Sequence, residues 1–410
     1  MEPKIRLKGF SGEWLETTFD SLAKIRRGLT YSPSNIIAKG IRVLRSSNIN
    51  EDTFVTSEDD VFVEEECVNI PLANDGDILI TAANGSPRLV GKHAVIKNNG
   101  SKMVPGGFMV LAMTDEPYFL NSCMSSPWYK KFLKIGVAGG NGAIGNLNKT
   151  ALCDSVLFIP TNRVERDSIA SYFQHLDSLI QSTTKKIESL KQVKAASLQS
   201  MFPQEGETVP RVRFKGFEGE WEKVALNNYA RRVTRKNKNM ESTLALTISS
   251  IDGLVSQIDY FNNLVVGANL ANYYLLKNGE FAYNKSYSKG YPFGSVKRLD
   301  RYDQGILSTL YIVFSINNQI SSDYLARFFD SILWHKQVAQ RAEEGARNHG
   351  LLNIGADDFM TINIVVPPSL DEQQLVADYF TNLDRQITLH TQRMEKLKQI
   401  KSACLDNMFV

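Results

Sequence analysis

The sequence repeats itself once, and this repeat limits the folds open to the chain more than any other feature. The segment Lys8-Gly9-Phe10-Ser11-Gly12-Glu13-Trp14 recurs 207 residues later as Lys215-Gly216-Phe217-Glu218-Gly219-Glu220-Trp221. The same offset relates Tyr172-Phe173 to Tyr379-Phe380 and Met201-Phe202 to Met408-Phe409, and a weaker match at offset 203 relates Ser46-Ser47 to Ser249-Ser250. Matches spread this widely predict two copies of one architecture, each with a shared frame around a variable body.

Each copy ends in a segment with a heptad pattern. Apolar residues that step by four and three positions are typical of a coiled-coil seam of period 3.5. The pattern predicts helices over residues 166–201 and 372–408, paired antiparallel within one chain. Lys194 and Lys401 fall on the seams and are expected to fix the register. The alternative is two unrelated amphipathic helices, each packed on its own domain. The predicted seam comprises Ile169, Phe173, Leu176, Ile180, Ile187 and Leu190 in the first helix, and Val376, Phe380, Leu383, Ile387, Met394 and Leu397 in the second.

The variable bodies are expected to mix short strands with a few helices. Residues 77–80 and 310–314 have the apolar, β-branched composition of strands, and residues 323–341 have helical periodicity. Residues 203–210 contain two prolines and a glycine and are predicted to form a linker.

The ionisable and sulfur-containing residues exclude several classes of protein. A net charge of +3 does not by itself identify a nucleic-acid binder. The four cysteines have no CxxC spacing and the five histidines are scattered, so neither a disulfide scaffold nor a metal site is expected. No apolar run approaches the roughly 18 residues of a membrane span, and residues 1–20 lack a signal-peptide core. We therefore expect a cytoplasmic protein without membrane contact.

Two glycine-rich segments resemble catalytic motifs but lack the required context. Gly140-Asn141-Gly142-Ala143-Ile144-Gly145 matches GxGxxG, yet a basic, helical stretch over residues 129–134 precedes it instead of a strand. In Gly85-Ser86-Pro87-Arg88-Leu89-Val90-Gly91-Lys92 the glycines are one residue too far apart for a phosphate-binding loop, and His93 stands where Ser or Thr is needed. The chain is therefore predicted to carry no catalytic site. A methyltransferase of unusual sequence is the alternative, and it would bind S-adenosylmethionine as the isolated chain.

One segment is strongly basic. Residues 211–240 contain nine Lys or Arg against three Glu, which is enough excess charge to follow a phosphate backbone. Within it, Arg231, Arg232, Arg235, Lys236 and Lys238 are predicted to contact phosphates. A solvated basic surface is the alternative.

With the repeat and the long helices, this chain resembles the specificity subunits of type I restriction-modification enzymes. The elements that carry the resemblance are the Gly-Phe-x-Gly-Glu-Trp segments at Gly9 and Gly216, Gly76-Asp77-Ile78-Leu79, Phe281-Ala282-Tyr283-Asn284-Lys285-Ser286-Tyr287 and the Leu-Lys-Gln helices. Residues 283–311 look like one branch of that family's target-recognition domains. The first domain departs from this branch at Thr81-Ala82-Ala83-Asn84-Gly85.

The resemblance implies an architecture and a set of partners. The fold class is α+β, a tandem repeat of two mixed α/β target-recognition domains separated by two long antiparallel coiled-coil helices with pseudo-twofold symmetry. The expected boundaries are 1–158 for the first domain, 159–202 for the central helix, 203–212 for a linker, 213–365 for the second domain and 366–410 for the C-terminal helix. Each domain would read one half of a bipartite site in double-stranded DNA.

The same resemblance implies which subunits bring cofactors. Two methylation subunits would bring S-adenosylmethionine, and restriction subunits would bring ATP and Mg²⁺; none of these is expected on this chain. Helices of roughly 55 Å would act as a ruler that leaves about 5–7 unread base pairs between the half-sites. A scaffold that makes no DNA contact is the alternative.

Residues that would read bases are predicted in both domains. In the second domain Lys285, Tyr287, Lys289 and Tyr291 interleave cations with aromatic rings, and Lys297 and Arg298 are expected on phosphates. A strand pair with surface lysines is the alternative there. The first domain gives a thinner signal, and any of its candidates is as readily structural: Arg45, Asn48, Thr81, Asn84, Arg88 and Lys92.

Overall fold

A computed structural model describes residues 1–98, 100–138, 144–261, 270–342 and 352–410. The chain divides into two compact units. Unit 1 comprises Met1–Lys185 together with Thr391–Val410, and unit 2 comprises Lys186–His390. The glycine-rich residues 140–143 of the GxGxxG match lie outside the described residues. No helix in the described ranges is both long and apolar enough to cross a membrane.

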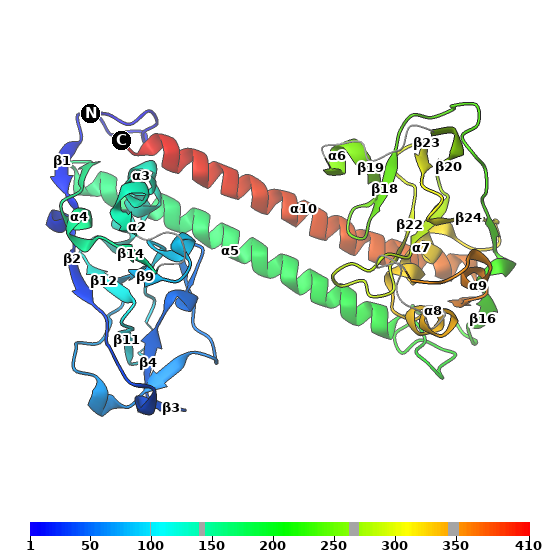
Figure 1. The fold of residues 1–410 in the computed structure, drawn as a ribbon, viewed down its shortest axis with the longest axis horizontal. Helices are drawn as coiled ribbons and strands as arrows, with labels where there is room; N and C mark the ends of the chain where they lie inside the picture. Colours follow the sequence, from blue (N-terminus) through cyan, green and yellow to red (C-terminus); the bar gives the residue numbers. More distant parts are fainter. Residues whose placement is uncertain (99, 139–143, 262–269, 343–351) are drawn as a thin grey trace. The chain divides into compact units, whose positions relative to one another are not determined.

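Two long helices are shared between the units. Helix α5 spans Arg163–Ser200 and α10 spans Leu370–Met408. In unit 1 the Tyr172 hydroxyl lies 3.3 Å from Cys404 Sγ and the Thr184 hydroxyl lies 3.4 Å from Met394 Sδ. Partner numbers fall on α10 as they rise on α5, so the helices run antiparallel (Figure 1). This confirms the predicted helix pair.

Unit 2 repeats this antiparallel pairing with the other ends of the same helices. Ser197 and Tyr379 join their hydroxyls at 2.9 Å, the counterpart of the contact between Cys404 and Tyr172. The predicted seam residues of both helices are all buried or half-buried, and many belong to the hydrophobic core of their own unit. The helices therefore pack on each other and on the domain bodies.

A buried ion pair anchors the start of each copy to its helix. Arg6 binds Glu165 at 2.7 Å in unit 1, and Arg213 binds Glu372 at 2.7 Å in unit 2. Each arginine also donates to two backbone carbonyls of the loop that follows it. The side chains of both glutamates are only 1% exposed. In each copy the leading loop thus wraps around the equivalent arginine, Arg6 or Arg213.

The repeated Gly-x-x-Gly and Trp positions have separate structural reasons. Gly9 and Gly12 adopt φ of 92° and 94°, a conformation that side chains with a Cβ disfavour. Trp14 packs edge-on against Phe409, with ring centroids 6.2 Å apart, just as Trp221 packs against Phe202. The first and last residues of the chain therefore meet in unit 1, where Figure 1 marks both termini.

The body of unit 1 is built from short strands and four helices within the described ranges. One sheet has the order β10 (His93–Val95), β8 (Ile78–Thr81), β12 (Met109–Met113), β2 (Lys24–Arg27). A second has the order β11 (Met103–Pro105), β4 (Ile41–Leu44), β7 (Val61–Val63), β3 (Ile36–Ile37). Smaller groups are β13 (Val137–Ala138), β14 (Gly145–Leu147) and β9 (Ala83–Asn84); β5 (Ile49–Asn50) with β6 (Thr53–Phe54); and β1 (Leu15–Thr18) with β15 (Val156–Ile159). The helices are α1 (Phe19–Leu22), α2 (Pro117–Ser125), α3 (Pro127–Gly136) and α4 (Lys149–Cys153).

The body of unit 2 has a comparable mixture. Its four-stranded sheet has the order β17 (Ala230–Arg232), β24 (Ile312–Ile316), β21 (Phe281–Asn284), β22 (Ser295–Arg298). The paired strands are β18 (Leu246–Ser249) with β19 (Gly253–Ser256), β20 (Tyr274–Lys277) with β23 (Gln304–Leu307), and β16 (Glu222–Ala225) with β25 (Asn363–Val366). The described helices are α6 (Gln257–Phe261), α7 (Ser322–Asp330), α8 (His335–Arg341) and α9 (Ala356–Met360).

Most predicted elements of the bodies exist, and one is wrong. The strands expected at 77–80 and 310–314 are β8 and β24, and the helical stretch at 129–134 lies in α3. The single helix expected over 323–341 is instead two helices. Ser331 ends α7 because both its backbone N–H and its hydroxyl donate to the Phe328 carbonyl, and Trp334 is then buried at 1% exposure. Burial of the indole outweighs continuation of the helix.

Candidate nucleic-acid interface

The loops of unit 1 converge at one edge of its body. Strands β2, β4, β8 and β11 end there and β12 begins there, because Arg27 pairs with Val110 and Thr81 pairs with Met109, while β11 runs parallel to β4. Four loops emerge side by side: 28–30, 45–48, 82–88 and 106–108. We call this set the unit 1 loop edge.

Hydrogen bonds hold these loops together. The backbone N–H groups of Ala82 and Ala83 donate to the Phe108 carbonyl at 2.8 and 3.0 Å. The Asn84 amide donates to the Ser46 hydroxyl at 3.2 Å and so joins the loop after β9 to the loop after β4. The unit 1 loop edge is thus a connected surface.

Three exposed arginines and one exposed aromatic ring lie on this surface. Arg27, Arg45 and Arg88 are exposed, and none of the three forms an ion pair within the described part of the chain. Burial, together with the positive charge of Arg27, lowers the pKa of Lys149. Phe108 is 63% exposed at the tip of the turn between β11 and β12. Neighbouring cations without acidic partners, beside an exposed ring, suit a polyanion with flat bases.

Two predicted contacts in unit 1 need correction. Asn48 is 1% exposed, and its amide accepts from Arg45 N and donates to Val55 O and Asp60 Oδ1, so it shapes the loop instead of facing a base. Thr81 is fully buried in β8 and cannot reach a ligand. The roles of Arg45, Asn84, Arg88 and Lys92 in DNA contact stay predictions; Asn84 and Lys92 are half-buried.

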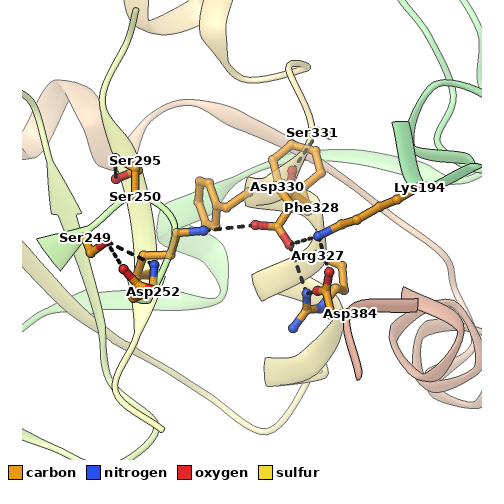
Figure 2. Close-up of polar contacts among 12 residues, drawn as sticks. Lys194, Ser249, Ser250, Asp252, Ser295, Arg327, Phe328, Asp330, Ser331 and Asp384 are labelled. Atoms are coloured by element: carbon orange, nitrogen blue, oxygen red, sulfur yellow. Dashed lines mark hydrogen bonds and ion pairs between the residues drawn. The ribbon is translucent and has the colours of Figure 1, made fainter. Parts of the chain in front are cut away.

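Unit 2 has a corresponding set of loops. The hairpin of residues 285–294 joins β21 to β22, and the turn of residues 250–252 joins β18 to β19. The Ser250 hydroxyl lies 3.1 Å from that of Ser295, while Ser249 bonds Asp252 across the turn (Figure 2). The Ser250 hydroxyl also lies 3.3 Å from that of Ser288. We call these two loops the unit 2 loop edge.

The two loop edges are related by the internal repeat. Ser46-Ser47 aligns with Ser249-Ser250 at offset 203, and Asn84 lies 204 residues before Ser288. In each unit a side chain of the serine loop is hydrogen-bonded to the loop after the aligned strand, although the serine differs: Ser46 in unit 1, and in unit 2 Ser250, which aligns with Ser47. At the unit 2 loop edge Lys289 and Tyr287 are exposed, Ile251 is 83% exposed, and Tyr291 is half-buried.

Five predicted contacts in unit 2 point inward or are paired, and these need correction. Arg235 binds Glu280 at 2.6 Å, and Lys236 donates to the Asn272 carbonyl and lies 4.1 Å from the Tyr274 ring centre. Lys285 is half-buried and donates to the Ile354 carbonyl at 3.3 Å. The last two have acidic partners: Lys297 binds Asp330 at 3.2 Å, and Arg298 binds Asp300 at 2.6 Å and Asp323 at 2.7 Å.

The remaining predicted cations of unit 2 are exposed. Arg231 donates to the carbonyls of Asn227 and Ala230. Arg232 and Lys238 are exposed, and neither has an ion pair in the ranges that the structure describes. Their roles on phosphates stay predictions.

Three residues at the loop edges were not predicted from the sequence: Arg27, Phe108 and Ile251. Gly106-Gly107-Phe108 and Ile251-Asp252-Gly253 both place an apolar residue in a turn between strands, where no core packing explains it. That pattern was the available signal. No group of three or more potential metal ligands occurs among the described residues.

Comparison with known proteins links this fold to one family. The sequence profile of the type I restriction modification DNA specificity domain matches residues 257–399. The crystal structure of the S subunit of a type I restriction-modification system from M. genitalium matches with 13% identity and a TM-score of 0.62, covering 100% of this chain and 99% of that chain. A structure reported on complex assembly and conformational transition of the type I R-M system matches with 12% identity and a TM-score of 0.52, covering 96% and 97%. A search of curated proteins found no match.

Proposed function

We propose that this chain is a type I restriction-modification DNA specificity subunit, which selects a bipartite DNA site for the methylation and restriction subunits of its complex. The specificity-domain profile over residues 257–399 and the S-subunit fold support this proposal. The body of each unit reads one half-site through its loop edge. The observation that carries this proposal is the pair of loop edges, in which corresponding loops are joined in each unit by a side-chain hydrogen bond.

The chemistry of the complex belongs to its other subunits. Methylation subunits supply S-adenosylmethionine, and restriction subunits supply ATP and Mg²⁺. This chain contributes recognition: exposed cations set affinity through phosphates, and the side chains at the centre of each loop edge choose the sequence.

A repeated outward face of the long helices suits a partner that binds twice. Glu188, Lys191, Gln192 and Ala196 are exposed on α5, and the residues 207 positions later on α10 are identical: Glu395, Lys398, Gln399 and Ala403. Of the residues on α10, Glu395, Gln399 and Ala403 are exposed, while Lys398 is half-buried and lies 3.6 Å from Glu51. Exposed positions have no packing reason to match. We assign these two faces to two copies of the methylation subunit.

The reading function is tested by exchanging one body. Residues 20–150 are replaced by the matching segment of another family member, and methylated sites are mapped across a genome. One half-site should change while the other stays the same. A change in both half-sites, or in neither, contradicts the division of labour.

The docking function is tested on one face at a time. Glu188→Lys with Lys191→Glu should reduce the number of bound methylation subunits from two to one, measured by native mass spectrometry. Lys185→Glu is the matched control, because Lys185 is exposed and its counterpart, Gln392, differs. Loss of both subunits, or of neither, contradicts the assignment.

A further inference from the structure

In unit 2 a lysine on the helix seam binds both the partner helix and the domain body. Lys194 Nζ lies 2.7 Å from Asp384 of α10 and 3.6 Å from Asp330 at the end of α7. Figure 2 shows Lys194 reaching toward both carboxylates. The lysine side chain is 21% exposed and Asp330 is 17% exposed, so the contact is sheltered from solvent.

In unit 1 the equivalent lysine makes the equivalent pair of contacts. Lys401 Nζ lies 2.8 Å from Asp177 of α5 and 3.0 Å from Asp52, which belongs to the turn between β5 and β6. The two helix aspartates, Asp177 and Asp384, match at the repeat offset. The two body aspartates do not, because one comes from a strand turn and the other from a helix end. The two bodies, which differ in structure here, therefore each present a carboxylate to the equivalent lysine of the repeated helices.

The surroundings of Lys401 favour its charged form. Burial alone would lower the pKa of Lys401, but Asp52 and Asp177 raise it above its ordinary value. A charged side chain on a helix seam costs stability that a methionine of similar length would not. The lysine contacts are therefore better explained by a role in positioning the body on the helices than by a gain in stability.

We propose that Lys194 and Lys401 are positioning residues that fix each reading body on its own helix pair and so determine which gap between half-sites the complex accepts. This inference rests on the proposed reading of a bipartite site. One base-pair step moves a half-site by about 3.4 Å, whereas a recognition site must hold its contacts to about 0.5 Å. A body free to tilt on its helices would tolerate the wrong gap.

We call each seam lysine with its two aspartates a latch, and in both units further contacts link the same body to the helices. Arg327 of α7 also binds Asp384, at 2.5 Å, and Lys297 binds Asp330. Loss of Lys194 would leave Arg327 joining the body to α10. In unit 1 the further contacts are an exposed pair, Lys398 with Glu51 at 3.6 Å, and a hydrogen bond from Gln181 to the Thr53 hydroxyl at 3.1 Å. Because an exposed ion pair contributes little, removal of Lys401 should have the larger effect.

The first experiment measures gap selectivity in the complex with methylation subunits. The half-sites are mapped by methylated-base sequencing, and binding is compared on DNA with the native gap and with one base pair added or removed. Lys401→Met should reduce the preference for the native gap about tenfold while affinity for each single half-site stays the same. Asp52→Asn should do the same, and Lys401→Arg should restore the preference.

The matched control is Arg6→Met, which breaks a buried pair between the leading loop and α5. It should lower the melting temperature at least as much as Lys401→Met without changing gap selectivity. Equal relaxation in Arg6→Met, or unchanged selectivity in Lys401→Met, would overturn the proposal.

A second measurement tests the latch without DNA. Hydrogen exchange of the turn around Asp52 should accelerate about tenfold in Lys401→Met and stay unchanged in Arg6→Met. Unchanged exchange would overturn the latch itself. If the wild-type complex recognises no pair of half-sites, the proposed function fails, and the exchange result still decides whether Lys401 holds the body.

Discussion

Among the described residues, the cations of the unit 1 loop edge have no ion pairs, whereas several cations of the unit 2 body are paired and others, such as Arg232, are exposed. At the unit 1 loop edge Arg27, Arg45 and Arg88 are exposed without ion pairs in the described structure. In unit 2, Arg235 and Arg298 are bound to carboxylates of their own body. The difference teaches that a basic residue is a candidate for DNA contact only when the fold leaves it unpaired.

By contrast, the repeated parts of the two units, the leading loop and the long helices, make equivalent contacts. The leading arginine, its glutamate and the Trp–Phe pair recur in both units with nearly equal distances. A shared frame has to hold two bodies whose loops differ, so the frame contacts should be equivalent and the loop contacts should not.

The largest effect should come from breaking the frame. Glu165→Ala leaves Arg6 largely buried without its partner, and Glu372→Ala does the same to Arg213. Each change should lower the free energy of unfolding of its unit by about 3 kcal/mol, measured by chemical denaturation. Losses that differ severalfold between the two variants would show that the frames are not equivalent.

A smaller effect should separate unpaired cations from paired ones. Arg45→Ala with Arg88→Ala should weaken DNA binding about tenfold and flatten its salt dependence by about 0.9 per lost phosphate contact. Lys297→Ala with Arg298→Ala is the control, since both residues bind acids of their own unit. The control should reduce stability and leave the slope of a salt titration unchanged. A flatter slope in the control would contradict the comparison.

The apolar turn residues should have a still smaller and more local effect. Phe108→Ala should remove on the order of 1 kcal/mol of base preference in the first half-site, and Ile251→Ala should do so in the second. Competition binding with single-base changes in each half-site measures this. If either variant alters the other half-site, the loop edges do not act separately.

The smallest predicted effect is on the stability of the fold at acidic pH. Burial alone would raise the pKa of Asp330, but Lys297, Lys194 and Arg327 outweigh it and hold that pKa below 3.8. A carboxyl whose folded pKa is lowered stabilises the fold above about pH 4, and the stability disappears as the pH falls through the folded pKa. Asp330→Asn should therefore flatten the acid limb of the stability curve.

Asp177 supplies the comparison in unit 1. Burial raises its pKa despite Lys401, so its ionisation disfavours the folded state as the pH rises. Asp177→Asn should therefore steepen the acid limb, the opposite of Asp330→Asn. The free energy of unfolding of both variants is measured between about pH 3 and pH 6. If both substitutions change its pH dependence in the same direction, the opposite pKa shifts inferred for Asp330 and Asp177 are wrong.

The sequence predicted the frame because repetition and heptad periodicity are local signals. It failed where pairing depends on distant residues. Arg235 meets Glu280, and Arg298 meets Asp323, across sequence separations that no local pattern reveals. The burial of Thr81 could have been predicted, because Thr81 directly follows the apolar run Ile78-Leu79-Ile80. In a strand that is buried on both faces, every side chain is buried.

The division of the chain into units has a consequence for its synthesis. Unit 2 is one continuous stretch, whereas unit 1 needs the last twenty residues, 391–410, to complete its core. A ribosome releases the chain from its N-terminus, so the domain that begins first is finished last. Until Phe409 emerges, the surface around Trp14 stays uncovered and open to chaperones or proteases. A truncation at the C-terminus should therefore damage the N-terminal domain and spare the second.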